Sequence, residues 1–263
     1  MKSPEKVAQH ITKWLSTYVE NASMNGFVVG VSGGIDSAVT STLCAKTKKK
    51  VLCLEMPIKQ DVGQISRSQN HINWLKSNFK NVSSQTLPLD SVFESFKQLI
   101  PETNDKEGQF LSLANTKARL RMTSLYYFAS LNGCLVVGTG NKVEDFGVGF
   151  YTKYGDGGVD MSPIADLMKT EVFSLASYLE IIESIQKASP TDGLWGDNRT
   201  DEDQLGATYP ELEWAMSALK NGVPTKDFTE REKEVFEIYH KHHLQNQHKM
   251  NPIPICKIPK GFV

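Results

Sequence analysis

Apolar residues follow two different periods along the chain, which predicts strands that alternate with helices. Short apolar, β-branched runs are typical of buried strands, and they occupy residues 27–31, 51–56 and 134–138, while residues 82–89 predict a weaker strand. Apolar residues at helical spacing predict helices over residues 7–18, 65–79, 90–100, 111–131, 170–182, 209–219 and 230–249, and a further helix that begins near residue 38. This alternation predicts an α/β fold, a doubly wound and mostly parallel sheet with helices on both faces.

Two long connections interrupt this pattern. Residues 139–163 are rich in glycine and poor in periodic apolar residues, and residues 189–203 are polar. Connections of this length are usually functional or disordered. We expect residues 147–156 and 194–204 to act as mobile lids over a ligand site.

The composition is that of an ordinary globular protein. The chain has 263 residues, of which 40% are hydrophobic and 22% charged, and we expect one α/β domain over residues 1–263. A formal net charge of −1 argues against a general nucleic-acid surface, and no apolar run is long enough to span a membrane. No apolar signal core follows Met1, and the four cysteines form no C-x-x-C pair. These features argue against zinc and predict a cytoplasmic protein.

A glycine-rich turn follows the first predicted strand and precedes a helix. It comprises Gly30, Val31, Ser32, Gly33, Gly34, Ile35, Asp36 and Ser37. Gly33 and Gly34 allow a sharp turn that brings backbone N–H groups close to a ligand, and the start of the helix offers unsatisfied donors and partial positive charge. The turn therefore predicts a phosphate site, although its spacing is neither the G-x-x-x-x-G-K-[ST] nor the G-x-G-x-x-G pattern.

Asp36 is the unexpected member of this turn, because an acid beside a phosphate is unfavourable by about 4 kcal/mol at roughly 4 Å with an effective dielectric near 20. A divalent cation that bridges the two anions removes the conflict, and Mg²⁺ prefers carboxylate and phosphate oxygens. The alternative interpretation is an ordinary strand–turn–helix corner with an aspartate in the first helical turn. The sequence Ser-Gly-Gly-Ile-Asp-Ser at 32–37 resembles the loop of the ATP-pyrophosphatase (PP-loop) superfamily, whose members release pyrophosphate from ATP and adenylate a substrate oxygen.

Three later segments carry further candidate chemistry. Residues 138–145 follow an apolar strand, at the end where open α/β sheets bind ligands, so Glu144 or Asp145 could supply a second carboxylate; the alternative is a helix start whose acids favour the dipole. Residues 150–160 are dense in Gly, Lys and Asp, with Lys153 as a phosphate partner and Asp160 as an acceptor for an amide or ribose, unless the segment is a surface hairpin. Residues 115–122 hold Arg119 and Arg121, which do not share a helix face, so one can face a site and the other solvent; the alternative is an ordinary helix surface.

Together these motifs resemble the NAD synthetase family, above all in Thr-Lys-Tyr-Gly-Asp-Gly-Gly at 152–158 and His-Lys at 248–249. The resemblance implies an adenine nucleotide alpha hydrolase-like fold and a site for ATP formed by residues 30–37 with Thr139, Lys169 and Thr191. It implies Mg²⁺ on Asp36 and Glu144, and contacts to deamido-NAD⁺ from Arg119, Lys153, Asp160, His248 and Lys249. In that family the dinucleotide lies at a dimer interface, so a homodimer is implied.

The implied reaction amidates deamido-NAD⁺ through an adenylate, giving NAD⁺, AMP and pyrophosphate. Catalysis would rest on positioning and electrostatics, since no nucleophile and base pair is evident. Glutamine-dependent members carry an additional amidohydrolase domain, and the first strand near residue 27 leaves no room for it, so we expect free ammonia as the nitrogen source. Two alternatives are a tRNA-modifying adenylase, which would have a basic groove and paired cysteines, and a non-catalytic nucleotide sensor, which would not need Asp36, Glu144 and Lys169.

The chain departs from the family pattern at one place. Many ammonia-dependent members have G-T-D-H-A-A-E where this chain has Gly-Thr-Gly-Asn-Lys-Val-Glu at 138–144, and this chain has one extra residue between Glu144 and Lys153. The resemblance therefore leaves open whether Glu144 or Asp145 is the second metal ligand.

Overall fold

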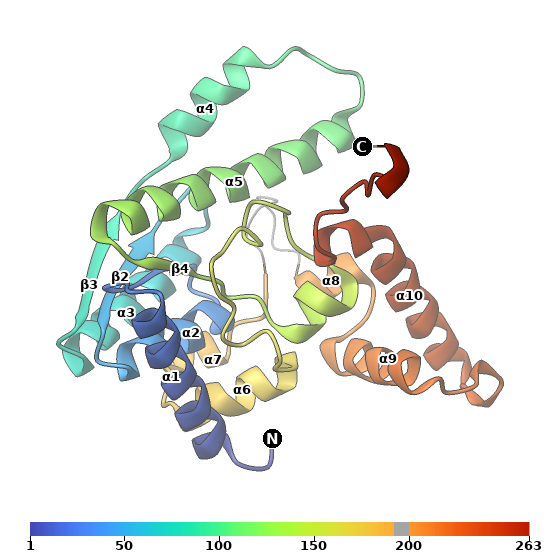
Figure 1. The fold of residues 1–263 in the computed structure, drawn as a ribbon, viewed down its shortest axis with the longest axis horizontal. Helices are drawn as coiled ribbons and strands as arrows, with labels where there is room; N and C mark the ends of the chain where they lie inside the picture. The colour runs from blue at the N-terminus through green and yellow to red at the C-terminus, as the bar shows by residue number, and fades with distance from the viewer. Residues whose placement is uncertain (192–199, 263) are drawn as a thin grey trace.

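A parallel four-stranded sheet forms the centre of the protein, in a computed structural model that describes residues 1–191 and 200–262 (Figure 1). Its strands are β1 (Gly26–Gly30), β2 (Lys50–Glu55), β3 (Val82–Thr86) and β4 (Leu135–Val137), in the order β3-β2-β1-β4. Every strand pair is parallel, with Val28 opposite Leu52 on one side and Val136 on the other. An additional bridge between Val137 and Met161 lies beyond β4. The four predicted strands and the parallel sheet are thus confirmed.

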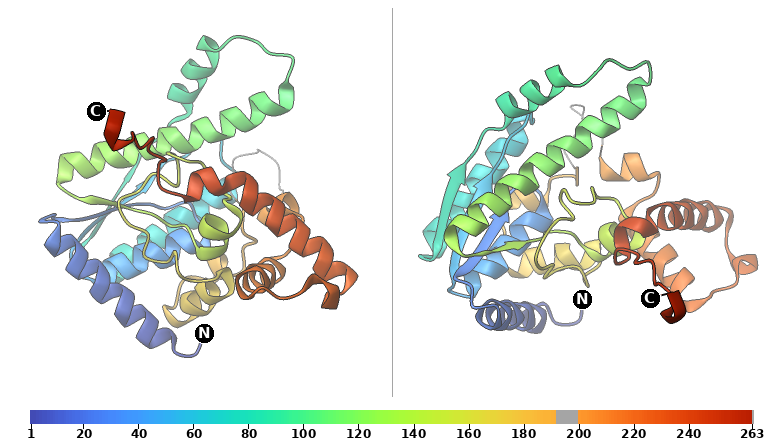
Figure 2. Two further views of the ribbon diagram at one scale, coloured as in Figure 1. Left: turned by 45° about the vertical axis from the view of Figure 1, so that its right-hand side comes forward. Right: turned by 45° about the horizontal axis from the view of Figure 1, so that its top comes forward.

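Alternate residues of the strands face two separate hydrophobic cores. Phe27 and Val29 pack with helices α1 (Pro4–Asn21), α2 (Ile35–Lys46), α3 (Val62–Asn78) and α6 (Lys169–Tyr178). Val28 and Val136 face the opposite core, which contains residues of α4 (Asp90–Leu99) and α5 (Lys106–Asn132). Figure 2 shows α4 and α5 on one side of the sheet and α1 and α6 on the other. The prediction of helices on both faces is confirmed. Because the central strands are buried on both faces, their sequences are unbroken apolar runs.

A third group of helices lies beside the sheet rather than on it. A π-helix, η1 (Lys142–Val148), packs against α9 (Tyr209–Asn221) and α10 (Glu230–Met250) around buried Val143, Leu212 and Tyr239. These helices form the right-hand part of Figure 1. The remaining short elements are α7 (Glu183–Gln186), α8 (Asp201–Leu205), η2 (Thr225–Asp227) and η3 (Lys260–Phe262). Within the part of the chain that the structure describes, no helix combines the length and the apolar character needed to cross a bilayer.

The structure corrects several predicted boundaries for identifiable reasons. The long helix α5 begins at Lys106 rather than at residue 111, because the Asp105 side chain accepts a hydrogen bond from the Gly108 N–H (2.9 Å) and caps it. The predicted helix over 170–182 ends early: α6 stops at Tyr178, Glu180 adopts a positive φ of 56°, and the next helix, α7, begins beyond the predicted range at Glu183. That backbone conformation cannot continue a right-handed helix.

The two long connections also differ from the prediction. The glycine content of residues 139–163 predicted a long loop, but this segment contains the helix η1. Of the expected lid over 194–204, residues 194–199 lie outside the described residues, and the remainder belongs to the Thr200 cap and helix α8. The other expected lid, 147–156, is described and connects η1 to the glycine-rich segment that follows it.

Candidate active site

A cavity of about 260 Å³ lies at the carboxyl ends of β1, β2 and β4. Gly30, Leu54 and Val137, at or near the ends of these strands, line it together with the whole glycine-rich turn. Parallel α/β sheets bind their ligands at this edge. All residues predicted for ATP line the same cavity: Gly30, Val31, Ser32, Gly33, Gly34, Ile35, Asp36, Ser37, Thr139, Lys169 and Thr191.

The backbone conformation of the glycine-rich turn and the hydrogen bonds within it suit an anion site. Gly33 has a φ of +85°, and a Cβ added there would meet the Gln64 carbonyl oxygen at 2.6 Å, so only glycine fits. Ser32 Oγ accepts a hydrogen bond from the Gly34 N–H (3.2 Å), and Ser37 Oγ donates one to the Gly34 carbonyl (3.0 Å). Helix α2 starts at Ile35 without a side-chain cap. Its first N–H groups are therefore available to an anion, as the sequence predicts.

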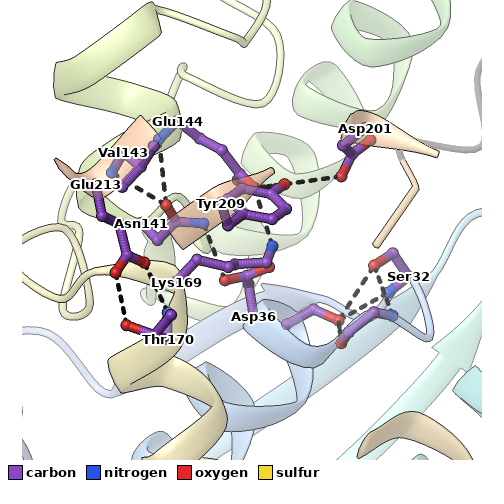
Figure 3. Close-up of polar contacts among 12 residues, drawn as sticks. Ser32, Asp36, Asn141, Val143, Glu144, Lys169, Thr170, Asp201, Tyr209 and Glu213 are labelled. Carbon is purple, nitrogen blue, oxygen red and sulfur yellow. Dashed lines mark hydrogen bonds and ion pairs between the residues drawn. The ribbon is translucent and has the colours of Figure 1, made fainter. Parts of the chain in front are cut away.

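Two carboxylates and one lysine form the charged centre of the cavity (Figure 3). Lys169 Nζ donates to Asp36 Oδ2 at 2.6 Å and to Glu144 Oε1 at 2.9 Å, and the lysine side chain is only 3% exposed. Burial alone would lower the pKa of Lys169, but the adjacent carboxylates outweigh it and raise that pKa. Lys169 is therefore a fixed cation that links the phosphate loop to η1.

The environments of the two carboxylates differ. Burial, with a contribution from the Glu144 charge, raises the pKa of Asp36 despite the attraction of Lys169. Burial also acts to raise the pKa of Glu144, but Lys169 and the Tyr209 hydroxyl stabilise its charged form and lower that pKa overall. Glu144 therefore holds its negative charge the more firmly of the two, while Asp36 responds to any cation that enters beside it.

Asn141 connects both carboxylates, and sequence reasoning did not single it out. Its Nδ2 donates to Asp36 Oδ1 (3.2 Å), while its Oδ1 accepts the N–H groups of Val143 and Glu144 (both 3.2 Å). The amide thus caps η1 and orients Asp36 at the same time (Figure 3). The available signal was an Asn, a preferred N-cap residue, four positions after the end of a buried strand.

Glu144, rather than Asp145, reaches the lysine that Asp36 also contacts. Asp145 lines the cavity too, but its carboxylate packs against Gly140, where a Cβ would clash with it. Burial raises the pKa of Asp145 well above its usual value, and the charges of Glu144, Asp156 and Asp36 add to this.

Tyr209 and Asp201 extend the network and were also missed. Tyr209 Oη lies 2.5 Å from Glu144 Oε1 and 3.1 Å from Asp201 Oδ2, and Lys169 Nζ lies 4.7 Å from the centre of the tyrosine ring. The carboxylates and burial raise the pKa of Tyr209, burial contributing most, so its hydroxyl stays protonated and donates. Tyr209 is the first residue of α9 and is 3% exposed. Nothing in the sequence around it distinguishes it from an ordinary core residue.

The five residues expected to contact the dinucleotide lie outside the cavity lining, and four of them form a second region. Arg119 Nη2 donates to the Lys153 carbonyl (3.3 Å), and Lys153 Nζ donates to the His248 carbonyl. Lys249 Nζ donates to the carbonyls of Gly149 and Tyr151, both at 2.9 Å. We call Arg119, Lys153, His248 and Lys249 the cationic cluster.

The fifth of these residues, Asp160, lies apart from the cationic cluster. It accepts hydrogen bonds from the Val136 N–H (2.8 Å) and the Tyr126 hydroxyl (3.0 Å), which hold it beside β4. The helix arginines divide as expected, since Arg121 lines the cavity and donates to the Met56 carbonyl (3.0 Å), whereas Arg119 is exposed.

Comparison with known proteins identifies similar chains over nearly the whole length. The NAD synthase family profile matches residues 7–253. The chain is 38% identical over 231 residues to an NH3-dependent NAD⁺ synthetase of Carboxydothermus hydrogenoformans, covering 86% of this chain and 91% of that protein. Its fold is similar to that of an NMN synthetase from Francisella tularensis, with a TM-score of 0.81, 30% identity and 98% and 99% of the two chains covered. An NH3-dependent NAD synthetase from Campylobacter jejuni matches with a TM-score of 0.78, 25% identity and 97% and 100% coverage.

Proposed function

The chain belongs to the NAD synthase family, and we propose that it is a ligase that uses ATP and ammonia to convert deamido-NAD⁺ to NAD⁺, AMP and pyrophosphate. One observation carries the proposal. The turn at Gly30–Ser37 lines the same cavity as Glu144 and Lys169, and Lys169 pairs with both Glu144 and Asp36 of the turn. A chain that only sensed nucleotides would not need this buried set of charges, whose desolvation is costly.

We propose that Mg²⁺ binds with ATP at Asp36 and Glu144. Their carboxylates converge on one ammonium group, so they are close enough to serve one site, and both are oxygen donors. Among the described residues there is no cluster of three or more His, Cys, Asp or Glu that could hold a metal. Mg²⁺ is commonly held by one or two carboxylates together with substrate phosphates, so this sparse donor set fits it. When bound, the ion would neutralise the departing pyrophosphate.

The reaction we propose has two displacements. The nicotinate carboxylate of deamido-NAD⁺ attacks the α-phosphorus of ATP, the bond to the β-phosphate oxygen breaks, and pyrophosphate leaves with the electron pair. Ammonia then attacks the acyl carbon of the adenylate, AMP leaves, and the nitrogen loses a proton. The turn at 30–37 would hold the phosphates through N–H groups and hydroxyls, and Lys169 would keep both carboxylates in place. These contributions are positioning and electrostatic stabilisation, without a covalent enzyme intermediate.

We propose that the cationic cluster binds the dinucleotide and that a second copy of the chain completes this region. Arg119 and Lys153 are suited to phosphate oxygens. Apolar side chains on the helices of the neighbouring sheet face are exposed in the single chain: Leu99 is 82%, Tyr127 63% and Leu131 68% exposed. Exposed apolar groups of this size favour an interface, and light scattering should therefore report a homodimer. A monomer at micromolar concentration would contradict this part of the proposal.

We also propose that the enzyme works in the cytoplasm and uses free ammonia. The cysteines Cys44, Cys53, Cys134 and Cys256 are all free, as is usual in a reducing compartment. The direct test is to incubate the purified protein with deamido-NAD⁺, ATP, Mg²⁺ and either ammonium or glutamine. We expect equal amounts of NAD⁺, AMP and pyrophosphate from ammonium and far less product from glutamine. Equal or better use of glutamine would contradict the ammonia assignment.

A second candidate substrate is favoured by one comparison. The Francisella tularensis structure is described as an NMN synthetase and is 30% identical to this chain, so nicotinate mononucleotide is the competing carboxylate. The same assay with nicotinate mononucleotide in place of deamido-NAD⁺ decides between them through the ratio of the kcat/KM values. We expect the dinucleotide to be preferred, and a ratio in favour of the mononucleotide would reassign the substrate while leaving the ATP chemistry intact.

A further inference from the structure

Arg67 is placed by the fold directly against the phosphate-binding turn. It lies in the second turn of α3, and a Cβ added at Gly33 would be 3.3 Å from the Arg67 Cβ and 3.1 Å from the Ser68 nitrogen. Arg67 also lines the cavity beside Gly33 and Gly34. An arginine side chain is long enough to reach a phosphate bound in the adjacent turn.

The guanidinium of Arg67 has no partner within the described chain. Its Nε is buried and makes no hydrogen bond, and no hydrogen bond or ion pair involves its other nitrogens among residues 1–191 and 200–262. Buried polar groups are nearly always satisfied, so an unsatisfied one requires an explanation. A ligand that enters the cavity is the simplest source of the missing acceptor.

The charges that line the cavity show why this group matters. More acids than cations line the cavity. The acids are Asp36, Glu144, Asp145, Asp156 and Asp201, and the cations are Arg67, Arg121 and Lys169. Lys169 is engaged by two carboxylates, and Arg121 donates to a main-chain carbonyl. A polyphosphate adds further negative charge to a lining that is already acidic. Among the described residues, Arg67 is the lining cation that makes no hydrogen bond or ion pair, and it therefore remains available to the polyphosphate.

We propose that Arg67 binds the β- and γ-phosphates of ATP, and hence the departing pyrophosphate, as an additional substrate-binding residue. The proposal rests on the proposed function for the identity of the reaction. The planar guanidinium donates two parallel hydrogen bonds to phosphate oxygens, which a lysine cannot do. As charge accumulates on pyrophosphate during its departure, these bonds strengthen, and Arg67 therefore lowers the barrier of the first displacement.

The test compares Arg67→Met and Arg67→Lys with Arg231→Met, a matched arginine control outside the cavity that pairs with Glu211 and Glu234. Calorimetric titrations with Mg²⁺ present use inorganic pyrophosphate and AMP as separate probes. For Arg67→Met we expect pyrophosphate affinity to fall by about tenfold or more, with AMP affinity within about twofold of wild type. Arg67→Lys should show an intermediate loss, and Arg231→Met none.

Several results would overturn the proposal. Unchanged pyrophosphate affinity in Arg67→Met, or no pyrophosphate binding by the wild-type protein, would exclude the contact. Equal losses for pyrophosphate and AMP would indicate a structural role instead. If Arg67→Met fails to fold, the decision rests on Arg67→Lys, which must weaken pyrophosphate more than AMP. A wild-type protein that does not amidate deamido-NAD⁺ but shows this selective loss would refute the proposed function and leave the Arg67 contact standing.

Discussion

The cavity and the cationic cluster hold their charges in opposite ways. In the cavity Lys169 is 3% exposed and is neutralised by two carboxylates that are 17% and 14% exposed. In the cationic cluster Arg119, Lys153 and Lys249 donate to main-chain carbonyls. A carbonyl orients a cation without cancelling its charge. The buried lysine of the cavity is therefore compensated by acids, whereas the cations of the cluster meet main-chain carbonyls and keep their positive charge.

This difference predicts that substitutions in the cavity affect the chemical step and that substitutions in the cluster affect binding of the dinucleotide. The largest effect should come from Asp36→Asn, which keeps the shape of the side chain but removes its charge. We expect pyrophosphate release to fall by about 10³-fold, because the substitution removes a group that stabilises the departing charge. The affinity for deamido-NAD⁺, measured by calorimetry, should change by less than about threefold.

The matched control for Asp36→Asn is Asp166→Asn, an exposed carboxylate that pairs with Lys142 on the surface. Its turnover should equal that of the wild type. Near-normal pyrophosphate release by Asp36→Asn would contradict the assignment of a metal to this carboxylate. If the affinity for deamido-NAD⁺ fell together with pyrophosphate release, the cavity and the cationic cluster would not act separately.

Acid should weaken the cavity region before the cluster, because a buried histidine supports the phosphate-binding turn. His71 Nε2 lies 3.0 Å from Ser41 Oγ, which in turn donates to the Ser37 carbonyl (2.7 Å). Burial lowers the pKa of His71 from 6.5 to about 4. The unfolded chain therefore binds this proton between those pH values and the folded chain does not, so this contribution to stability is complete above pH 6.5 and lost as the pH falls toward 4.

The loss should amount to about 3 kcal/mol of unfolding free energy across that range. Urea unfolding at pH 7 and pH 4 measures it, with His71→Asn as the variant in which this part of the slope disappears. Identical slopes for wild type and His71→Asn would contradict the assignment.

In the cationic cluster, the double substitution Arg119→Met with Lys153→Met should raise the KM for deamido-NAD⁺ by about 10- to 100-fold, the loss typical of charged hydrogen bonds. The KM for ATP should stay within about twofold. Lys233→Met, on the surface of α10 beside Glu230, is the control. A larger rise in the KM for ATP than in the KM for deamido-NAD⁺ would show that the cluster does not bind the dinucleotide.

The smallest effect should come from Tyr209→Phe, which removes the hydroxyl that contacts Glu144 and Asp201 but keeps the ring in place. We expect kcat to fall by about tenfold, with a higher Mg²⁺ concentration at half-maximal rate, because Glu144 loses a donor that orients it. The KM for deamido-NAD⁺ should be unchanged, while the melting temperature should fall by a few degrees because buried Glu144 loses a donor. Tyr178→Phe, at an exposed position, controls for loss of a hydroxyl, and an unaltered Mg²⁺ dependence in Tyr209→Phe would exclude the positioning role.

The contiguous parts of the site were predictable from the sequence, and the distant contacts only in part. The turn at 30–37 is recognisable because a strand, small residues and a helix follow one another. Lys169 lies 133 residues from Asp36, so no local pattern connects them, and its role came from the family resemblance. Tyr209, Asn141 and Arg67 were missed because they occupy ordinary helix or cap positions, and only the tertiary structure brings them to the cavity.

The fold shows the same division between local and distant information. Strand and helix order followed from apolar periodicity, because burial on both faces of the sheet imposes it. The π-helix η1 was not predicted, since neither the helical nor the strand period describes it, and its cap by Asn141 depends on a contact with Asp36. The end of α6 at Tyr178, short of the predicted residue 182, depends on the backbone at Glu180, which apolar spacing does not encode.

The most direct test of the account follows an oxygen atom through the reaction. Deamido-NAD⁺ with oxygen-18 in its nicotinate carboxylate is incubated with the protein, ATP, Mg²⁺ and ammonium, and the AMP is examined by mass spectrometry. If the carboxylate attacks the α-phosphorus and pyrophosphate leaves, each AMP carries one labelled oxygen from the substrate. AMP without the label, or ADP and phosphate as products, would contradict adenylation in this cavity.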